Sequence, residues 1–115
     1  MKSKIIALSK NEEFKYLLQQ KKISNQYTTV FFGVLKNKNK DKLNISFVAK
    51  RKIGNAVKRN KIKRRLRNII NDAIKKISIK FDYSYLVIAK PTMLNNDYTN
   101  IKETLFQSFK KIKWW

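Results

Sequence analysis

The side chains whose types and spacing could do chemistry gather in one basic segment, residues 50–67. Ten of its eighteen residues are Lys or Arg, and the chain has no acidic residue from 42 to 71. Lysines occur throughout the sequence, whereas all five arginines lie between Arg51 and Arg67. Because the planar guanidinium group can bind a phosphate through two parallel hydrogen bonds, this clustering predicts positioned contacts with phosphates and not a charge excess alone.

The sequence offers no set of residues that would make the polypeptide a nuclease by itself. It contains no His and no Cys, so the commonest general base, a cysteine nucleophile and a thiolate metal site are excluded. Of its 7 acidic residues, Glu12 and Glu13 suit the first turn of a helix and the others are scattered. We therefore expect no catalytic side chain and no metal ion held by the protein alone.

The net charge narrows the class of partner. With 28 basic and 7 acidic residues the formal charge is +21, and a polyanion would relieve the resulting repulsion. Nucleic acid is the expected polyanion, because Lys and Arg that neutralise phosphates release counterions. A membrane surface is a weaker alternative, since it would require a lipid anchor or a lipid-facing helix. No apolar run is long enough for a signal peptide or a membrane span, so we expect a cytoplasmic protein with no membrane partner.

The N-terminal half is predicted to contain a helix and two or three strands. A capping box at residues 9–12 opens a helix of about 10–20. Residues 27–35 predict a strand, with a start as early as Ile23, and residues 43–49 predict a second strand that forms a hairpin with the first. A polar turn over residues 36–42 would join them.

The C-terminal half is predicted to contain a long helix, a strand and a last helix. Asn55 is a suitable N-cap for a helix of about 56–77, followed by a buried strand over 83–89 and a helix over 97–113. The apolar stripe of the long helix consists of Ile62, Leu66, Ile69, Ile70, Ala73, Ile74 and Ile77. The whole order, α-β-β(-β)-α-β-α, describes an α+β fold, a two-layer α/β sandwich formed by one domain over residues 1–115. In it the strand after the long helix could lie parallel to an earlier strand.

Arg59 interrupts the pattern of the long helix, because it falls at helical spacing with Ile62 and Leu66 on the apolar stripe. A core position should not hold Arg, so the first turns of this helix are predicted to overhang the core, with Arg59 at the edge of the sheet. Free backbone N–H groups and the helix dipole favour phosphate at such an end. Extra cations there cost stability, and a bound anion would offset that cost.

Read as a unit, residues 51–67 closely resemble the signature of the protein subunit of bacterial ribonuclease P. In that family a Lys-Gly-Asn-Ala-Val run leads into an Arg-Asn-Arg helix, and here Gly54-Asn55-Ala56-Val57 leads into Arg59-Asn60-Lys61. The resemblance extends over most of the chain, to residues 8–14, 87–91 and 97–102. It implies a left-handed crossover through the long helix, against the usual right-handed rule.

The resemblance implies a ribonucleoprotein endonuclease that removes the 5′ leader of precursor tRNA, with Mg²⁺ held mainly by the catalytic RNA. The partners would be that RNA and precursor tRNA, with no obligate protein partner. The RNA-binding residues it implies are Lys50, Arg51, Lys52, Asn55, Lys58, Arg59, Asn60, Lys61, Lys63, Arg64 and Arg67. The leader would lie in a shallow cleft between the first helix and the sheet, at Phe14, Leu18 and Phe32.

Two positions depart from the family pattern, and three interpretations stay open. Lys61 stands where a second Arg is usual, which keeps the charge and loses the bidentate geometry. Leu18 stands where an aromatic residue is common, which removes a base-stacking ring. Phe31 and Phe32 are adjacent in a strand and so face opposite sides, with one of them in the core. Phe14 fits a core position as well as a cleft. The alternative function is a ribosomal or other structural RNA-binding protein without a processing role.

Overall fold

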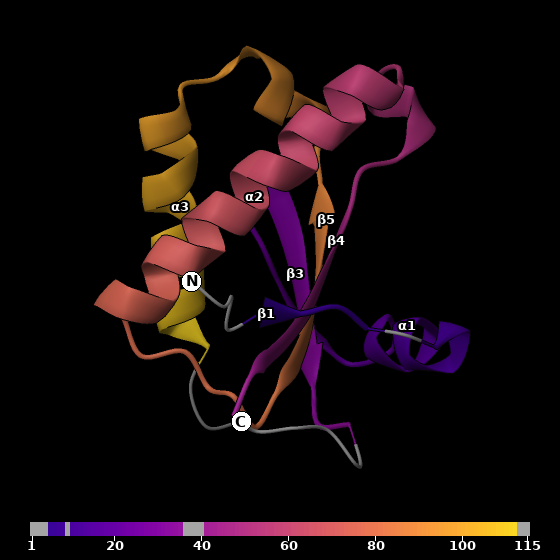
Figure 1. Ribbon diagram of the computed structural model, residues 1–115, viewed down its shortest axis with the longest axis vertical. Coiled ribbons are helices and arrows are strands. Elements are labelled where there is room, and N and C mark those ends of the chain that lie inside the picture. The colour runs from indigo at the N-terminus through magenta and orange to yellow at the C-terminus, as the bar shows by residue number, and fades with distance from the viewer. Residues whose placement is uncertain (1–4, 9, 36–40, 113–115) are drawn as a thin grey trace.

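The computed structural model describes residues 5–8, 10–35 and 41–112, and over these the chain forms a five-stranded sheet with helices on both faces (Figure 1). The elements in chain order are β1 (Ile5–Ile6), α1 (Asn11–Leu17), β2 (Lys21–Ser24), β3 (Thr28–Gly33), β4 (Leu43–Val48), η1 (Arg51–Ile53), α2 (Ala56–Lys76), β5 (Ser84–Ala89), η2 (Pro91–Asn95) and α3 (Tyr98–Lys111). Two short 3₁₀ helices, η1 and η2, follow strands β4 and β5. The α+β class predicted from the sequence is confirmed, and helix α1 adds a layer that the predicted two-layer sandwich did not include, on the face opposite α2 and α3.

The order of strands across the sheet is β1-β4-β5-β3-β2. Strand β5 lies between β4 and β3, parallel to the first and antiparallel to the second. The predicted hairpin between the strands at 27–35 and 43–49 is therefore wrong, whereas the predicted parallel pairing of the strand after the long helix is confirmed. Alternation along a strand shows which faces are covered, but it does not show which strand is the neighbour. The handedness of the β4–α2–β5 crossover stays a prediction.

The strand predicted over residues 27–35 is part of a hairpin of two strands, β2 and β3, which pair in antiparallel register. Asn25 makes the turn between them, because its side-chain Oδ1 accepts hydrogen bonds from the backbone N–H of Tyr27 and of Thr28, both at 2.8 Å. Its Nδ2 donates to Thr28 Oγ1 and to Ser108 Oγ on α3, both at 2.9 Å. One side chain thus closes the turn and ties it to the C-terminal helix.

Helix α1 is shorter than predicted, and its cap lies one residue later. The Ser9 of the predicted capping box lies outside the described residues, as does most of the predicted turn at 36–42. The carboxylate of Glu13 accepts a hydrogen bond from the Lys10 backbone N–H at 3.2 Å, which supplies one half of a capping box. The helix ends at Leu17 because the next residues turn into β2, with Gln20 N–H donating to Leu17 O at 3.0 Å.

The sheet separates two apolar cores. The larger core lies between the sheet and the helices α2 and α3, and Ile45, Leu66, Tyr85 and Leu105 are fully buried in it. The smaller one lies on the opposite face, under α1, and consists of Leu8, Leu17 and Leu86 with partly buried neighbours. Each face of β5 therefore serves a different layer of the fold.

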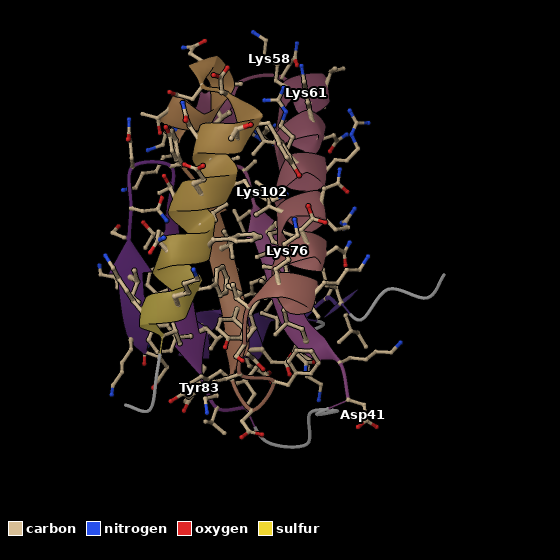
Figure 2. The ribbon with its side chains drawn as sticks, turned by 90° about the vertical axis from the view of Figure 1, so that its left-hand side faces the viewer. Asp41, Lys58, Lys61, Lys76, Tyr83 and Lys102 are labelled. Carbon is tan, nitrogen blue, oxygen red and sulfur yellow. The ribbon has the colours of Figure 1, made fainter. Side chains whose placement is uncertain are left out.

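Helices α2 and α3 are joined by an ion pair as well as by apolar contacts. Helices α2 and α3 lie side by side in Figure 2, and Lys102 Nζ on α3 lies 2.6 Å from Asp72 Oδ2 on α2. The hydrogen bond from Lys102 holds the pKa of the Asp72 carboxyl below its ordinary value, and the carboxylate in turn raises the pKa of Lys102. The one acid on α2 is thus engaged by α3, far from the N-terminal half of the helix.

The turn at Asn25 gives a test of the fold. Replacing Asn25 by Ala removes four hydrogen bonds and leaves the buried Ser108 without this donor, so the free energy of unfolding should fall by about 2 to 3 kcal/mol. Urea unfolding followed by circular dichroism measures the change. Gln26→Ala is the matched control, because its exposed side chain lies in the same turn. Equal midpoints for the two variants would contradict the assigned role of Asn25.

Candidate nucleic-acid interface

The basic segment begins where β4 ends and continues through η1 into α2. Ile53 is buried and anchors η1 on the larger core, while Arg51 and Lys52 are exposed beside it. Gly54 has a φ of 157°, and a Cβ atom there would lie 2.9 Å from Lys58 Cδ and 3.3 Å from Lys58 Cβ. Glycine therefore allows the sharp turn that brings η1 against the first turn of α2.

Asn55 caps α2, as predicted. Its side-chain Oδ1 accepts a hydrogen bond from the Lys58 backbone N–H at 3.0 Å. The first turn of α2 holds no acidic residue, so no carboxylate offsets the positive end of the helix dipole. An uncompensated positive helix end next to exposed cations is a suitable place for a phosphate.

The first turns of α2 overhang the core, which confirms that prediction. The buried residues of the helix start at Ile62, whereas Val57 is 76% exposed and Lys58 is also exposed. Arg59 is half-buried, and its Nε is a buried atom with no hydrogen-bond partner among the described residues. Buried polar atoms are nearly always hydrogen-bonded, so the Nε of Arg59 is an exception. The described part of the fold supplies no acceptor for it.

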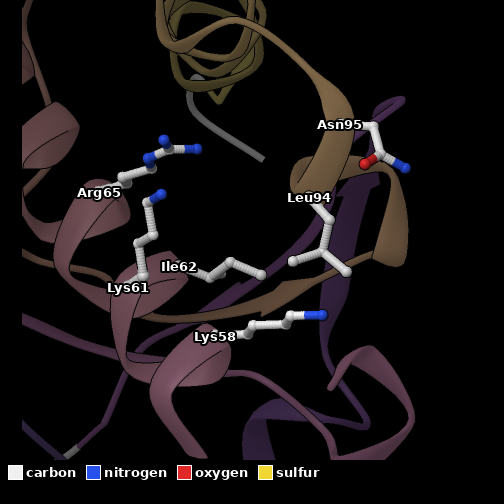
Figure 3. A pocket seen from close by; sticks show the side chains of 6 residues that line it. All are labelled: Lys58, Lys61, Ile62, Arg65, Leu94 and Asn95. Carbon is white, nitrogen blue, oxygen red and sulfur yellow. The ribbon is translucent and has the colours of Figure 1, made fainter. Parts of the chain in front are cut away.

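The cations of α2 surround its N-terminal half. At 100° per residue, Lys58, Lys61 and Arg65 share one flank, which faces η2 (Figure 3). The opposite flank holds Lys63 and Arg67, the outer side holds Asn60 and Arg64, and Arg59 lies in line with the apolar stripe. The fold thus brings the predicted RNA-binding residues of α2 together around one helix end, with Lys50, Arg51 and Lys52 beside them. Arg65 belongs to this set by position, although the sequence comparison with the family did not single it out.

A partly covered apolar surface lies on the other face of the sheet, beside α1. Helix α1 is fixed there by Leu17, which is fully buried, and by the Leu8 backbone N–H, which donates to Ser46 Oγ at 2.9 Å. The partly buried side chains around this smaller core are Phe14, Phe31, Leu35, Val48 and Ile88. We call them, with Lys22, Ser24 and Thr29 on the same side of β2 and β3, the open face.

Phe14 and Leu18 are both accessible, but Phe32 is not. Phe14 is half-buried at the border of α1 and the sheet, and Leu18, just past the end of α1, is 47% exposed. Phe32 is only 2% exposed and its ring packs edge-on against Tyr83, with centroids 5.5 Å apart, in the larger core. The expectation that Phe32 faces the cleft is therefore wrong by one residue in register.

Phe31 occupies the position on the open face that was expected for Phe32. It pairs with Leu86 across β3 and β5, and its side chain belongs to the smaller core. Lys22 Nζ lies 5.8 Å from the centroid of its ring, which places a cation beside an accessible aromatic face. The sequence showed that one of the two rings is free, but two adjacent phenylalanines give no signal of which one.

The two candidate surfaces lie on opposite faces of the sheet, with α2 on one face and α1 on the other (Figure 1). They approach each other where β4 ends, since Val48 lies on the open face and Lys50 opens the basic segment. Within the described residues no group of three or more acidic side chains could hold a metal ion, and none of the described helices has the length and apolar character needed to cross a bilayer.

Sequence comparison connects the chain to one family. A family model described as Ribonuclease P matches residues 3–113. The ribonuclease P protein component of Carboxydothermus hydrogenoformans is 34% identical over 110 residues, covering 92% of this chain and 90% of that protein. The ribonuclease P protein component of Fusobacterium nucleatum is 36% identical over 115 residues, covering 92% of this chain and 96% of that protein.

Solved structures with the same fold carry the same family name. The RNase P protein from Thermotoga maritima superimposes with a TM-score of 0.79 at 25% sequence identity, over 95% of this chain and 99% of that chain. The RNase P protein of Staphylococcus aureus superimposes with a TM-score of 0.78 at 25% identity, over 93% and 94% of the two chains. The similarity in each case covers nearly the entire length of both chains.

The Nε of Arg59, which has no partner among the described residues, leads to a prediction for the stability of the free protein. Arg59→Met keeps the aliphatic stem and removes the buried polar atom, so the free energy of unfolding should rise by up to about 1 kcal/mol. Arg64→Met, five residues later at an exposed position, controls for the loss of one positive charge. Urea unfolding of both variants measures the difference. A loss of stability in Arg59→Met alone would show that the guanidinium group has an acceptor within the fold.

Proposed function

The chain belongs to the ribonuclease P protein family, and on this premise we propose that it binds the catalytic RNA of ribonuclease P through the basic segment. Proteins of this family are the protein component of ribonuclease P. What we propose is which surfaces of this chain bind RNA. The observation that carries it is the N-terminal end of α2, which has no acid in its first turn and carries the exposed cations Lys58, Lys61 and Arg64. An RNA phosphate supplies an acceptor of the right charge.

The 5′ leader of precursor tRNA is proposed to lie on the open face. Single-stranded nucleic acid is bound by aromatic side chains that stack on bases, combined with cations that follow the backbone. Phe14 and Phe31 supply the rings, and Lys22 supplies a cation beside one of them. The hydroxyls of Ser24 and Thr29, 2.9 Å apart, add polar groups on the same side of the sheet.

The role of the protein is to hold two polyanions together, and the hydrolysis is left to the RNA and its Mg²⁺. Catalytic RNA and precursor tRNA repel each other, and a chain of net charge +21 lowers that repulsion by displacing counterions. We propose that Mg²⁺ is held mainly by the RNA, because the sequence has no His or Cys and places its few acids apart from the basic segment. A cytoplasmic location follows from the proposed substrate.

Reconstitution tests the proposed function. The ribonuclease P RNA of the same genome, combined with this chain alone, should cleave precursor tRNA faster at low Mg²⁺ than the RNA does without protein. Arg59→Ala and Arg64→Ala should each weaken RNA binding and reduce the slope of log affinity against log salt by about 1. Lys75→Ala, at an exposed position in the last turn of α2, is the control. Binding to RNA without any stimulation of cleavage would favour a structural RNA-binding protein instead.

The open face has a test of its own. Phe31→Ala and Phe14→Ala should weaken binding of precursor tRNA about tenfold and leave binding of mature tRNA unchanged, as expected for the loss of one stacked base. Phe32→Ala should instead lower the free energy of unfolding by about 3 to 5 kcal/mol, because its ring is in the larger core. The affinities of the reconstituted enzyme for precursor and mature tRNA distinguish a leader contact of Phe14 and Phe31 from a structural role. Equal losses for precursor and mature tRNA would place Phe14 and Phe31 in a purely structural role.

A further inference from the structure

A pocket of about 220 Å³ lies between the basic half of α2 and the 3₁₀ helix η2. Three cations of α2 line it, Lys58, Lys61 and Arg65, and Ile62, Leu94 and Asn95 complete the lining (Figure 3). Figure 3 shows Ile62 and Leu94 pointing toward each other from the two elements, with the head groups of Lys61 and Arg65 to one side. The pocket thus combines an apolar floor with a cationic wall.

The three cations form one row, spaced i, i+3 and i+7 along α2. Like charges at this spacing repel each other on a helix surface and reduce its stability. Within the described residues none of the three side chains has a hydrogen-bonded or ion-paired partner, and no acidic residue lines the pocket. The single acid of α2, Asp72, is engaged by Lys102 farther along the helix. The wall is therefore uncompensated in the free protein and suited to an anion.

The size and chemistry of the pocket fit part of a larger ligand. Pockets for independent small molecules usually measure roughly 300 to 1,000 Å³, so about 220 Å³ suits a fragment that is held elsewhere as well. A phosphate alone would not use the apolar floor of Ile62 and Leu94. A nucleotide uses both parts, because its phosphate is an anion and its base has an apolar face. Asn95 adds a carboxamide that can pair with the edge of a base.

We propose that this pocket binds a single nucleotide of the catalytic RNA, with its phosphate on Lys61 and Arg65 and its base against Leu94. The inference rests on the proposed function, since it assigns one further contact to the same RNA. It adds Arg65, Leu94 and Asn95 to the RNA-binding residues. It also extends the interface from α2 onto η2, which follows β5 in the chain.

Binding of full-length variants to the ribonuclease P RNA tests the cationic wall and the polar edge. Arg65→Ala should lower the affinity about tenfold, whereas Lys75→Ala, at an exposed cation of α2 outside the pocket, should change it less than about twofold. Asn95→Asp places a carboxylate at the mouth of the pocket without changing its size and should also lower the affinity about tenfold. Asn100→Asp, exposed on α3, is the matched control for the added charge.

The apolar floor distinguishes a nucleotide from a general charge attraction. Leu94→Ala changes no charge, and it should lower RNA affinity about fivefold while leaving the salt slope unchanged. Val34→Ala, at an exposed apolar position outside both the pocket and the basic segment, should bind as the unsubstituted chain does. Thermal melting of each variant confirms that it is folded. A photo-crosslinking residue at position 94 should label one or two adjacent nucleotides of the RNA.

The outcomes separate this inference from the proposed function. If the unsubstituted chain binds the RNA and the Arg65, Leu94 and Asn95 variants bind equally well, the pocket contact is wrong and the proposed function stands. If the unsubstituted chain does not bind the RNA, the proposed function fails and the pocket contact fails with it. Adenosine monophosphate is the probe for a free-nucleotide site, and micromolar binding that is lost in Arg65→Ala, while the same variant binds the RNA as the unsubstituted chain does, would overturn the assignment to RNA.

Discussion

The packing of α2 on the sheet is the interaction on which the other features depend. Its buried residues start at Ile62 and end at Ala73, so the helix is held by its middle and its first turns project past the core. Asn55 and Gly54 fix the start of the helix at the point where η1 meets the core. Without this anchoring the cationic N-terminal end of α2 would have no fixed orientation. Contacts to phosphates position an RNA only when the contacting side chains are held in a fixed orientation.

The sheet keeps the two proposed RNA surfaces apart. Strand β5 presents Tyr85 and Val87 to the larger core and Leu86 to the smaller one, so a single strand supports both layers. Burial raises the pKa of Tyr85, whose hydroxyl donates to Lys80 O at 2.8 Å and remains protonated at neutral pH. This two-sided core supports both proposed surfaces, the basic segment on one face and the open face on the other.

Repulsion between positive charges lowers the stability of the free protein, and a bound polyanion would relieve it. A net charge of +21 acts against a compact state, and native proteins are stable by only about 5 to 15 kcal/mol. Arg59 adds a buried Nε without a hydrogen-bond partner among the described residues, and the row of Lys58, Lys61 and Arg65 adds repulsion along one helix flank. An RNA that binds the folded chain stabilises it by mass action and relieves these terms together. Features that weaken the free protein thus indicate where its partner binds.

The sequence by itself determined the α+β class, the boundaries of α2 to within one residue, the Asn55 cap and the off-pattern position of Arg59. These follow from local rules, since helical periodicity and capping involve residues only a few positions apart. Only the tertiary structure decided that β5 lies between β4 and β3, that Phe31 and not Phe32 faces the open side, and that η2 closes a pocket on the flank of α2. Strand order, register and pockets depend on contacts between residues distant in the chain, and the pattern along a single element carries no information about its neighbours.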